Sequence, residues 1–222
     1  PVVARTQKEM SMQWGQERAE WFPLLKGQLE AMLSRESVYV PMMNPFAAKE
    51  DDSSPLCESW RQKICEWCFD VVDHYKFDRE VVSYALNYLD RSVAMVASMG
   101  DNETKVSFQL KAMTCLYLAI KLHGETNVQC PHSRIKLSIS TFSTLSRGMF
   151  STGDIEKTER EILQSLSWMM NPPTPVNFVA HLLHQFMVPY ITHHHQTKVV
   201  SNIYDQGRYL TELCSCTSEL FI

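Results

Sequence analysis

The sequence predicts an all-α protein. Only seven glycines occur among 222 residues, and strand-like alternation of apolar and polar side chains is scarce. Apolar side chains make up 45% of the chain, which is enough for a substantial core in one or two domains. We therefore expect amphipathic helices that pack on one another.

The first helix is expected over residues 11–34, where apolar side chains recur at helical spacing and most charged ones lie opposite them. The apolar positions are Trp14, Trp21, Leu25, Leu29, Met32 and Leu33. The next stretch, residues 40–55, holds three prolines and an acidic-serine run, which break regular structure. Residues 1–55 are thus interpreted as an amphipathic helix followed by a connector.

Residues 56–170 are expected to form one domain of five helices. Ser53 or Ser54 can cap the first of these, and Thr152 or Asp154 the last. The third is apolar on nearly all sides, which is typical of a helix surrounded by others, so we expect it at the centre of the domain. The five expected helices cover about 56–74, 78–100, 108–122, 139–145 and 152–166.

A domain boundary is expected at residues 171–175, because the prolines there lack an amide hydrogen and disfavour helix in the residue before them. Two more amphipathic helices are predicted over 176–187 and 197–217. Two helices are too few to enclose a core, so residues 171–222 are interpreted as the start of a second, truncated helical domain. The chain begins with Pro1 and ends inside an apolar pattern, so we expect it to be a piece of a longer protein.

Charge and cysteine content narrow the function classes. The net charge is −4 and no run of lysine or arginine occurs, so we expect no binding to nucleic acid. The longest apolar stretch, residues 113–120, is too short to cross a bilayer, and no membrane association is expected. Seven cysteines, an odd number with no apolar leader before them, favour a reducing compartment, which is the nucleus or the cytoplasm.

No pattern points to catalysis or to a cofactor. The sequence has no glycine-rich phosphate loop and no G-x-S-x-G or H-E-x-x-H motif. Cys65-x-x-Cys68, the histidines at 193–195 and the pair Cys214-x-Cys216 could suggest zinc, but Cys65 and Cys68 fall within one predicted helix and no second C-x-x-C accompanies them. We interpret these cysteines as buried structural thiols and expect neither metal nor cofactor.

Six short motifs follow one another along residues 56–186. They are W-R-Q-K-I at 60–64 with a tryptophan at 67, L-N-Y-L-D-R at 86–91, F-Q-L at 108–110, L-A-I-K at 118–121, E-R-E-I-L with L-S-W at 159–168, and N-P-P-T-P-V-N-F at 171–178. In this order and spacing they resemble the cyclin box, and the combination is far more specific than any single motif. The resemblance implies five helices per box, a buried central helix and usually two boxes in tandem.

The resemblance implies a non-enzymatic regulatory subunit that activates a cyclin-dependent protein kinase, in cell-cycle control. In cyclins, residues that match Lys121 and Glu159 form hydrogen bonds to main-chain groups around the kinase's regulatory helix. From the residues alone, Lys121 could also be a lysine that simply reaches water. Phe77, Leu122 and residues 149–155 are weaker candidates for the apolar part of this contact, and core packing explains them equally well.

The resemblance also implies a buried ion pair between Arg61 and Asp90, and a shallow groove that docks Arg-x-Leu peptides of substrates or inhibitors. The two tryptophans of this groove could equally be core residues. Lys63 and Trp60 differ from the usual cyclin residues and change the shape of the groove. The residues that match the groove are Trp60, Trp67, Asp70, Phe108 and Gln109.

Two departures concern the edge that faces the kinase. Most cyclins have two acidic residues soon after the signature lysine, where this chain has His123-Gly124-Glu125, and the loop that follows is longer than usual. The identity of the kinase is therefore left open. An alternative function keeps the fold: cyclin boxes also serve as adaptors in transcription or scaffolding, without kinase activation.

Overall fold

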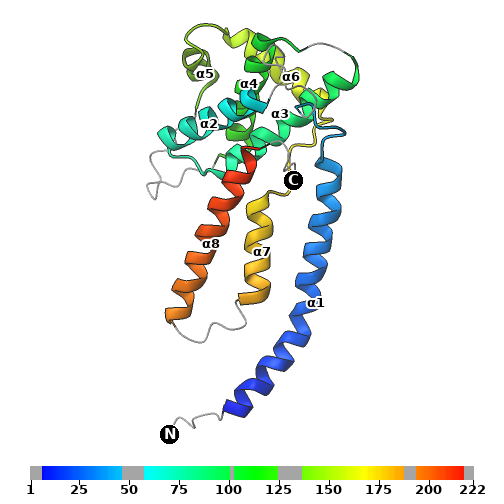
Figure 1. The fold of residues 1–222 in the computed structure, drawn as a ribbon, viewed down its shortest axis with the longest axis vertical. Helices are drawn as coiled ribbons and strands as arrows, with labels where there is room; N and C mark the ends of the chain where they lie inside the picture. Colours follow the sequence, from blue (N-terminus) through cyan, green and yellow to red (C-terminus); the bar gives the residue numbers. More distant parts are fainter. Residues whose placement is uncertain (1–6, 47–57, 101–102, 125–136, 188–193, 218–222) are drawn as a thin grey trace.

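The structure is a computed structural model that describes residues 7–46, 58–100, 103–124, 137–187 and 194–217. The described residues form eight helices and no strand, so the all-α prediction is confirmed (Figure 1). The helices are α1 Gln7–Tyr39, α2 Glu58–Tyr75, α3 Glu80–Ser98, α4 Lys105–His123, α5 Ile139–Leu145, α6 Thr152–Ser165, α7 Pro175–Met187 and α8 His194–Ser215.

Helix α1 is longer than the range 11–34 predicted for it. Nothing between Ser34 and Tyr39 breaks a helix, and α1 ends shortly before Pro41, as expected of a segment that precedes a proline. Pro23 lies inside α1, where the missing amide hydrogen favours a kink. Figure 1 shows α1 changing direction along its length.

Helix α4 lies at the centre of a bundle and packs against α2, α3, α5 and α6. Its predicted central position is confirmed. Few polar groups are found on it because it is enclosed by other helices on nearly every side. Its buried residues are Phe108, Ala112, Met113, Thr114, Cys115, Leu116, Leu118, Ala119 and Ile120.

Hydroxyl side chains cap the helices of the bundle. Thr104 caps α4 and Ser138 caps α5, each accepting a backbone amide of the first turn. Ser151 caps α6. Its Oγ accepts a hydrogen bond of 3.2 Å from the backbone amide of Asp154, and Oδ2 of Asp154 accepts one of 2.9 Å from the backbone amide of Ser151. The cap predicted at Thr152 or Asp154 is therefore wrong by position, because Ser151 and Asp154 form a capping box. The cap predicted at Ser53 or Ser54 falls outside the described residues.

Replacing Ser151 by alanine is expected to lower the free energy of unfolding by about 1 kcal/mol, because the amide of Asp154 loses its acceptor. Ser151→Thr is the matched control, since a threonine hydroxyl can accept the same bond. Urea unfolding followed by circular dichroism measures both changes. Equal losses in the two variants would show that the cap does not stabilise α6.

The same capping box gives an expected pH dependence. Hydrogen bonds from Ser151 lower the pKa of Asp154 below its ordinary value. A carboxyl whose pKa is lowered by folding contributes its full stabilisation above its ordinary pKa and loses it as the pH falls through the lowered value. The stability difference between Ser151→Ala and the unchanged chain should therefore shrink below about pH 4.

Helices α1, α7 and α8 extend from the same side of the bundle (Figure 1). The carboxyl end of α8 returns to the bundle, where the backbone oxygen of Ser215 accepts a hydrogen bond of 2.8 Å from Nη1 of Arg61. Two ion pairs, Arg79–Glu212 and Arg208–Asp78, also hold this half of α8, each with a nitrogen–oxygen distance of 2.5 Å. Helix α8 is thus anchored to α2 and to the start of α3.

Large apolar side chains stay exposed along α8. They fit the expectation that residues 171–222 do not enclose a core by themselves, and the second domain stays a prediction. Among the described helices, none has the length and apolar character needed to cross a membrane. The exposed side chains of α8 are Val199, Ile203, Tyr209, Leu210 and Leu213.

Candidate functional site

Lys121 and Glu159 meet at the edge of the bundle. Lys121 lies in the last turn of α4, and Glu159 lies on α6, which packs against α4. Nζ of Lys121 donates to Oε1 of Glu159 at 2.7 Å. The lysine side chain is 51% exposed and the glutamate side chain 14%, so the charge on the lysine faces outward while the carboxylate is mostly covered.

The chemistry of this pair suits contact with a polypeptide backbone. Hydrogen bonding to Glu159 raises the pKa of Lys121, so the ammonium stays charged at neutral pH. An ammonium has three donors and a carboxylate has two oxygens, and their contact engages one of each. The pair can therefore donate to a carbonyl and accept from an amide of another chain.

The apolar candidates for this contact include exposed and buried residues, and a cavity opens beside Lys121. Leu122 is 49% exposed and Met149 is 61% exposed, which makes both available to a partner. Phe77 and Ile155 are buried in the core, so these two candidates for the apolar contact pack inside the bundle instead. A cavity of about 380 Å³ opens beside Lys121 and Leu122. Its other lining residues are Asp78, Glu80, Val81, Tyr84, His123 and Gly124.

Arg61 and Asp90 form a bidentate pair in the core. Nε and Nη2 of Arg61 donate to the two carboxylate oxygens of Asp90, at 3.0 and 2.8 Å. Both side chains are only 4% exposed. Burial raises the pKa of Asp90, and the charge of Arg61 opposes that rise. Because Arg61 also donates to Ser215 O, this pair connects α2, α3 and the end of α8.

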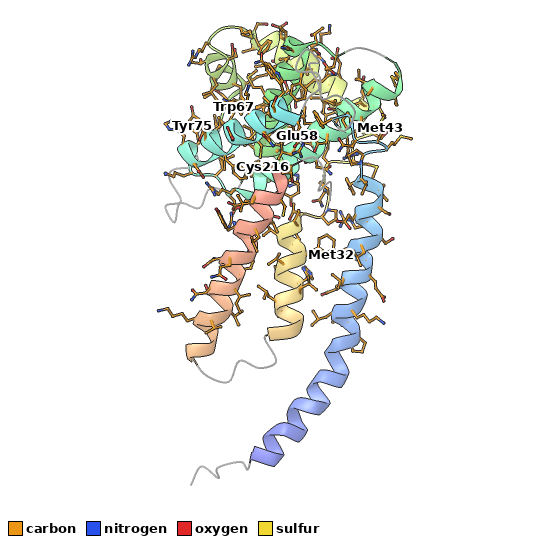
Figure 2. The ribbon with its side chains drawn as sticks, in the orientation of Figure 1. Met32, Met43, Glu58, Trp67, Tyr75 and Cys216 are labelled. Carbon is orange, nitrogen blue, oxygen red and sulfur yellow. The ribbon has the colours of Figure 1, made fainter. Side chains whose placement is uncertain are left out.

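The residues of the expected docking groove differ in accessibility. Trp60 and Trp67 are half-buried on α2, where Figure 2 shows Trp67, and both pack against the core. Asp70 is exposed and Gln109 is half-buried. Phe108 is fully buried. Phe108 therefore belongs to the core in this structure, and a docking surface has to be built from the other four.

Two lysines lie against Trp60. Nζ of Lys63 lies 5.6 Å from the centroid of the Trp60 ring, and Nζ of Lys105, from the first turn of α4, lies 5.1 Å from it. Both distances are within the range of cation–π contacts. The surface at Trp60 is therefore basic, whereas Asp70 makes the far end of the same helix acidic.

The cysteines of the bundle are buried thiols. Burial raises the pKa of Cys65, Cys68 and Cys115, so the three thiols stay protonated at neutral pH. Cys65 Sγ lies 2.9 Å from Sγ of Cys216, at the end of α8 that meets the bundle (Figure 2). In the described part of the chain, no three His, Cys, Asp or Glu side chains are arranged to hold a metal. The histidine at 193 falls outside that part.

Comparison with protein families matches residues 28–171 to the model described as "Cyclin, N-terminal domain". The match covers more than half of the chain and includes the bundle, Lys121 and Glu159. This chain belongs to the cyclin family. Cyclins are non-catalytic regulatory subunits, so the prediction that the chain is not an enzyme is confirmed.

The relatives of this cyclin include D-type cyclins. It is 29% identical over 161 residues to G1/S-specific cyclin-D2 of Gallus gallus, an alignment covering 72% of this chain and 50% of the relative. It is 30% identical over 176 residues to G1/S-specific cyclin-D1 of Danio rerio, covering 77% and 55%. With Cyclin-D3-3 of Arabidopsis thaliana the identity is 28% over 152 residues, covering 68% and 38%. The chain thus spans about half the length of these curated relatives.

Sequence reasoning missed the role of His123 in this cyclin. The ring of His123 stacks on Tyr84 with centroids 3.9 Å apart, and its Nε2 lies 2.9 Å from both Tyr88 Oη and Met170 O. Next to it, a Cβ on Gly124 would lie 2.4 Å from the carbonyl oxygen of Ile120, so only glycine fits without a shift. The departure from the family pattern at 123–124 therefore closes the end of α4 against α3 and the segment after α6.

Proposed function

We propose that this cyclin binds and activates a cyclin-dependent Ser/Thr protein kinase, in cell-cycle control. The observation that carries the proposal is the contact between Lys121 and Glu159 at the partly exposed junction of α4 and α6. Leu122, which follows Lys121 on α4, and Met149, which precedes α6, are both exposed and can supply the apolar part of the contact.

The mechanism is conformational. The helical face holds the αC helix of the kinase inward, so that the glutamate of αC pairs with the catalytic lysine of the kinase and the activation segment is released. Lys121 and Glu159 fix main-chain groups around αC by hydrogen bonds. Because the cyclin side is a packed bundle built around α4, little of its own structure has to be ordered on binding.

The proposal extends to location and substrates. We expect the chain to act in the nucleus or the cytoplasm, where its thiols stay reduced. Docking of Arg-x-Leu peptides at Trp60, Trp67, Asp70 and Gln109 stays a prediction, with Asp70 as the acidic partner of the arginine. The relatives named as G1/S-specific cyclins support a role in the same part of the cell cycle.

Affinity capture tests the proposal. The chain is expressed with a tag in cells of its source, and mass spectrometry identifies the kinase that copurifies. The captured complex should phosphorylate a generic serine-proline peptide faster than the same kinase alone. Copurification of transcription factors without a kinase would favour the adaptor function instead.

A further inference from the structure

We propose that the surface formed by Trp60, Lys63 and Lys105 binds an acidic segment of a protein partner, in which a carboxylate side chain stands next to an apolar one. The proposal concerns a docking surface and does not depend on kinase activation. It assigns to this end of α2 a ligand of opposite charge to the arginine of an Arg-x-Leu peptide.

The first argument is the convergence of two cations on one aromatic ring. Lys63 comes from α2 and Lys105 from the first turn of α4, and both place their ammonium groups within 5.6 Å of the centre of the Trp60 ring. Like charges held near one surface repel one another unless an anion comes between them. Both lysines are exposed and Trp60 is half-buried, so a partner can reach all three.

The second argument is that neither Lys63 nor Lys105 has a carboxylate within ion-pair distance among the described residues. Two other cations of the same helices do have one: Lys111 pairs with Glu103, and Arg61 with Asp90. Within the described part of the chain, the positive charge at Trp60 is therefore left for a ligand to balance.

The third argument is the distribution of charge along α2. Glu66 and Asp70 are exposed and lie one and two turns beyond Lys63. Ten residues separate Trp60 from Asp70, a rise of about 15 Å along the helix. The surface is thus basic at one end and acidic at the other, so a bound peptide is oriented with its acidic residue at Trp60. An arginine placed there would meet two ammonium groups.

Trp60 supplies the apolar part of the contact. A tryptophan offers a large, rigid apolar face, and residues of this type often dominate binding energy in protein interfaces. A leucine or phenylalanine next to the carboxylate can pack on this face. Charge then sets the specificity and the salt dependence of binding, while the ring supplies affinity.

Selection of peptides on the chain itself tests the proposal. A phage library of random octapeptides is selected on the immobilised chain, and selected peptides are measured by fluorescence polarisation. We expect enrichment of Asp or Glu next to Leu or Phe. Replacing the acidic residues by Asn or Gln should weaken binding about fivefold, and raising the salt concentration should weaken it further.

Variants locate the binding site. Lys63→Glu with Lys105→Glu should weaken binding of the acidic peptides about tenfold or more, since attraction becomes repulsion. Lys26→Glu with Lys157→Glu is the matched control: it makes the same change in net charge at exposed lysines of α1 and α6, and it should leave binding unchanged. Trp60→Ala should remove binding, and its circular dichroism reports whether it folds.

The proposal is overturned if the selected peptides are basic or uncharged, if no motif is enriched, or if the double Glu variant at Lys63 and Lys105 binds as tightly as the control. None of these readouts requires a kinase. Failure here therefore leaves the proposed kinase activation standing, and failure to capture a kinase leaves the peptide result standing.

Discussion

The chain with both Lys121→Ala and Glu159→Ala is expected to lose binding and activation of its kinase while it keeps its fold. Charged groups that form hydrogen bonds across an interface typically cost 2–5 kcal/mol when they are removed, so affinity should fall about 100-fold or more. The stability of the free chain should change by less than about 1 kcal/mol, because Lys121 is half exposed and such pairs contribute little to folding.

The chain offers a matched control for this experiment. Lys157 and Glu161 form an exposed ion pair on α6, the helix that also carries Glu159. Replacing both by alanine removes one lysine and one glutamate, as the tested variant does. Kinase activity and calorimetric affinity are measured for both double variants beside the unchanged chain. Equal activity in all three would contradict the assignment of Lys121 and Glu159. A comparable loss in the control would show that binding responds to the loss of any ion pair on this helix, and not to the loss of Lys121 and Glu159 in particular.

Periodicity was enough to predict where the helices of the bundle lie in the sequence and which of them is central. The run of apolar residues at 108–122 has no polar face, and a helix without a polar face has to be enclosed, which is how α4 is placed. The motif resemblance added the two pairs, Lys121 with Glu159 and Arg61 with Asp90. Such pairs join residues on different helices, so no local pattern in one helix reveals them.

The structure differs from the sequence predictions where the local backbone conformation, or a contact between segments far apart in the sequence, decides the outcome. Helix α6 ends at Ser165, one residue before the predicted end at 166. Ser167 and Trp168 follow it with positive φ angles of 51° and 63°, and Trp168 is 70% exposed. Stacking of His123 on Tyr84 depends on a tertiary contact between α4 and α3 that spacing cannot show. Phe108 is buried in the core, where its ring centroid lies 6.1 Å from that of Phe46, a residue of the segment expected to be a connector.

Removing either partner of the buried pair is expected to have the largest effect on stability. Arg61→Ala leaves the carboxylate of Asp90 buried without its cation, and Asp90→Ala leaves the guanidinium of Arg61 buried without its anion. Each change should lower the free energy of unfolding by about 3–5 kcal/mol. Domains of this kind have about 5–15 kcal/mol of stability in total, so either change removes a large part of it. Arg61→Ala also frees Ser215 O, which loosens the end of α8.

A double-mutant cycle measures the interaction energy between Arg61 and Asp90 apart from their other contacts. Urea unfolding of Arg61→Met, Asp90→Leu and the combined variant should show that the combined loss is smaller than the sum of the single losses, because no charge is left unpaired. Lys26→Ala with Glu30→Ala, an exposed pair on α1, is the control and should change stability by less than about 0.5 kcal/mol. Additive losses would show that Arg61 and Asp90 act independently.

The loss of stability caused by Arg61→Ala should be smaller at acidic pH than at neutral pH. Burial raises the pKa of Asp90, and without Arg61 nothing opposes that rise. A carboxyl whose pKa is higher in the folded state binds more protons there than in the unfolded state, so stability falls as the pH rises between the two values. The difference in the free energy of unfolding between Arg61→Ala and the unchanged chain should therefore be smaller near pH 4 than at about pH 7. A difference that grew on acidification would mean that Asp90 keeps its charge by finding another cation or water.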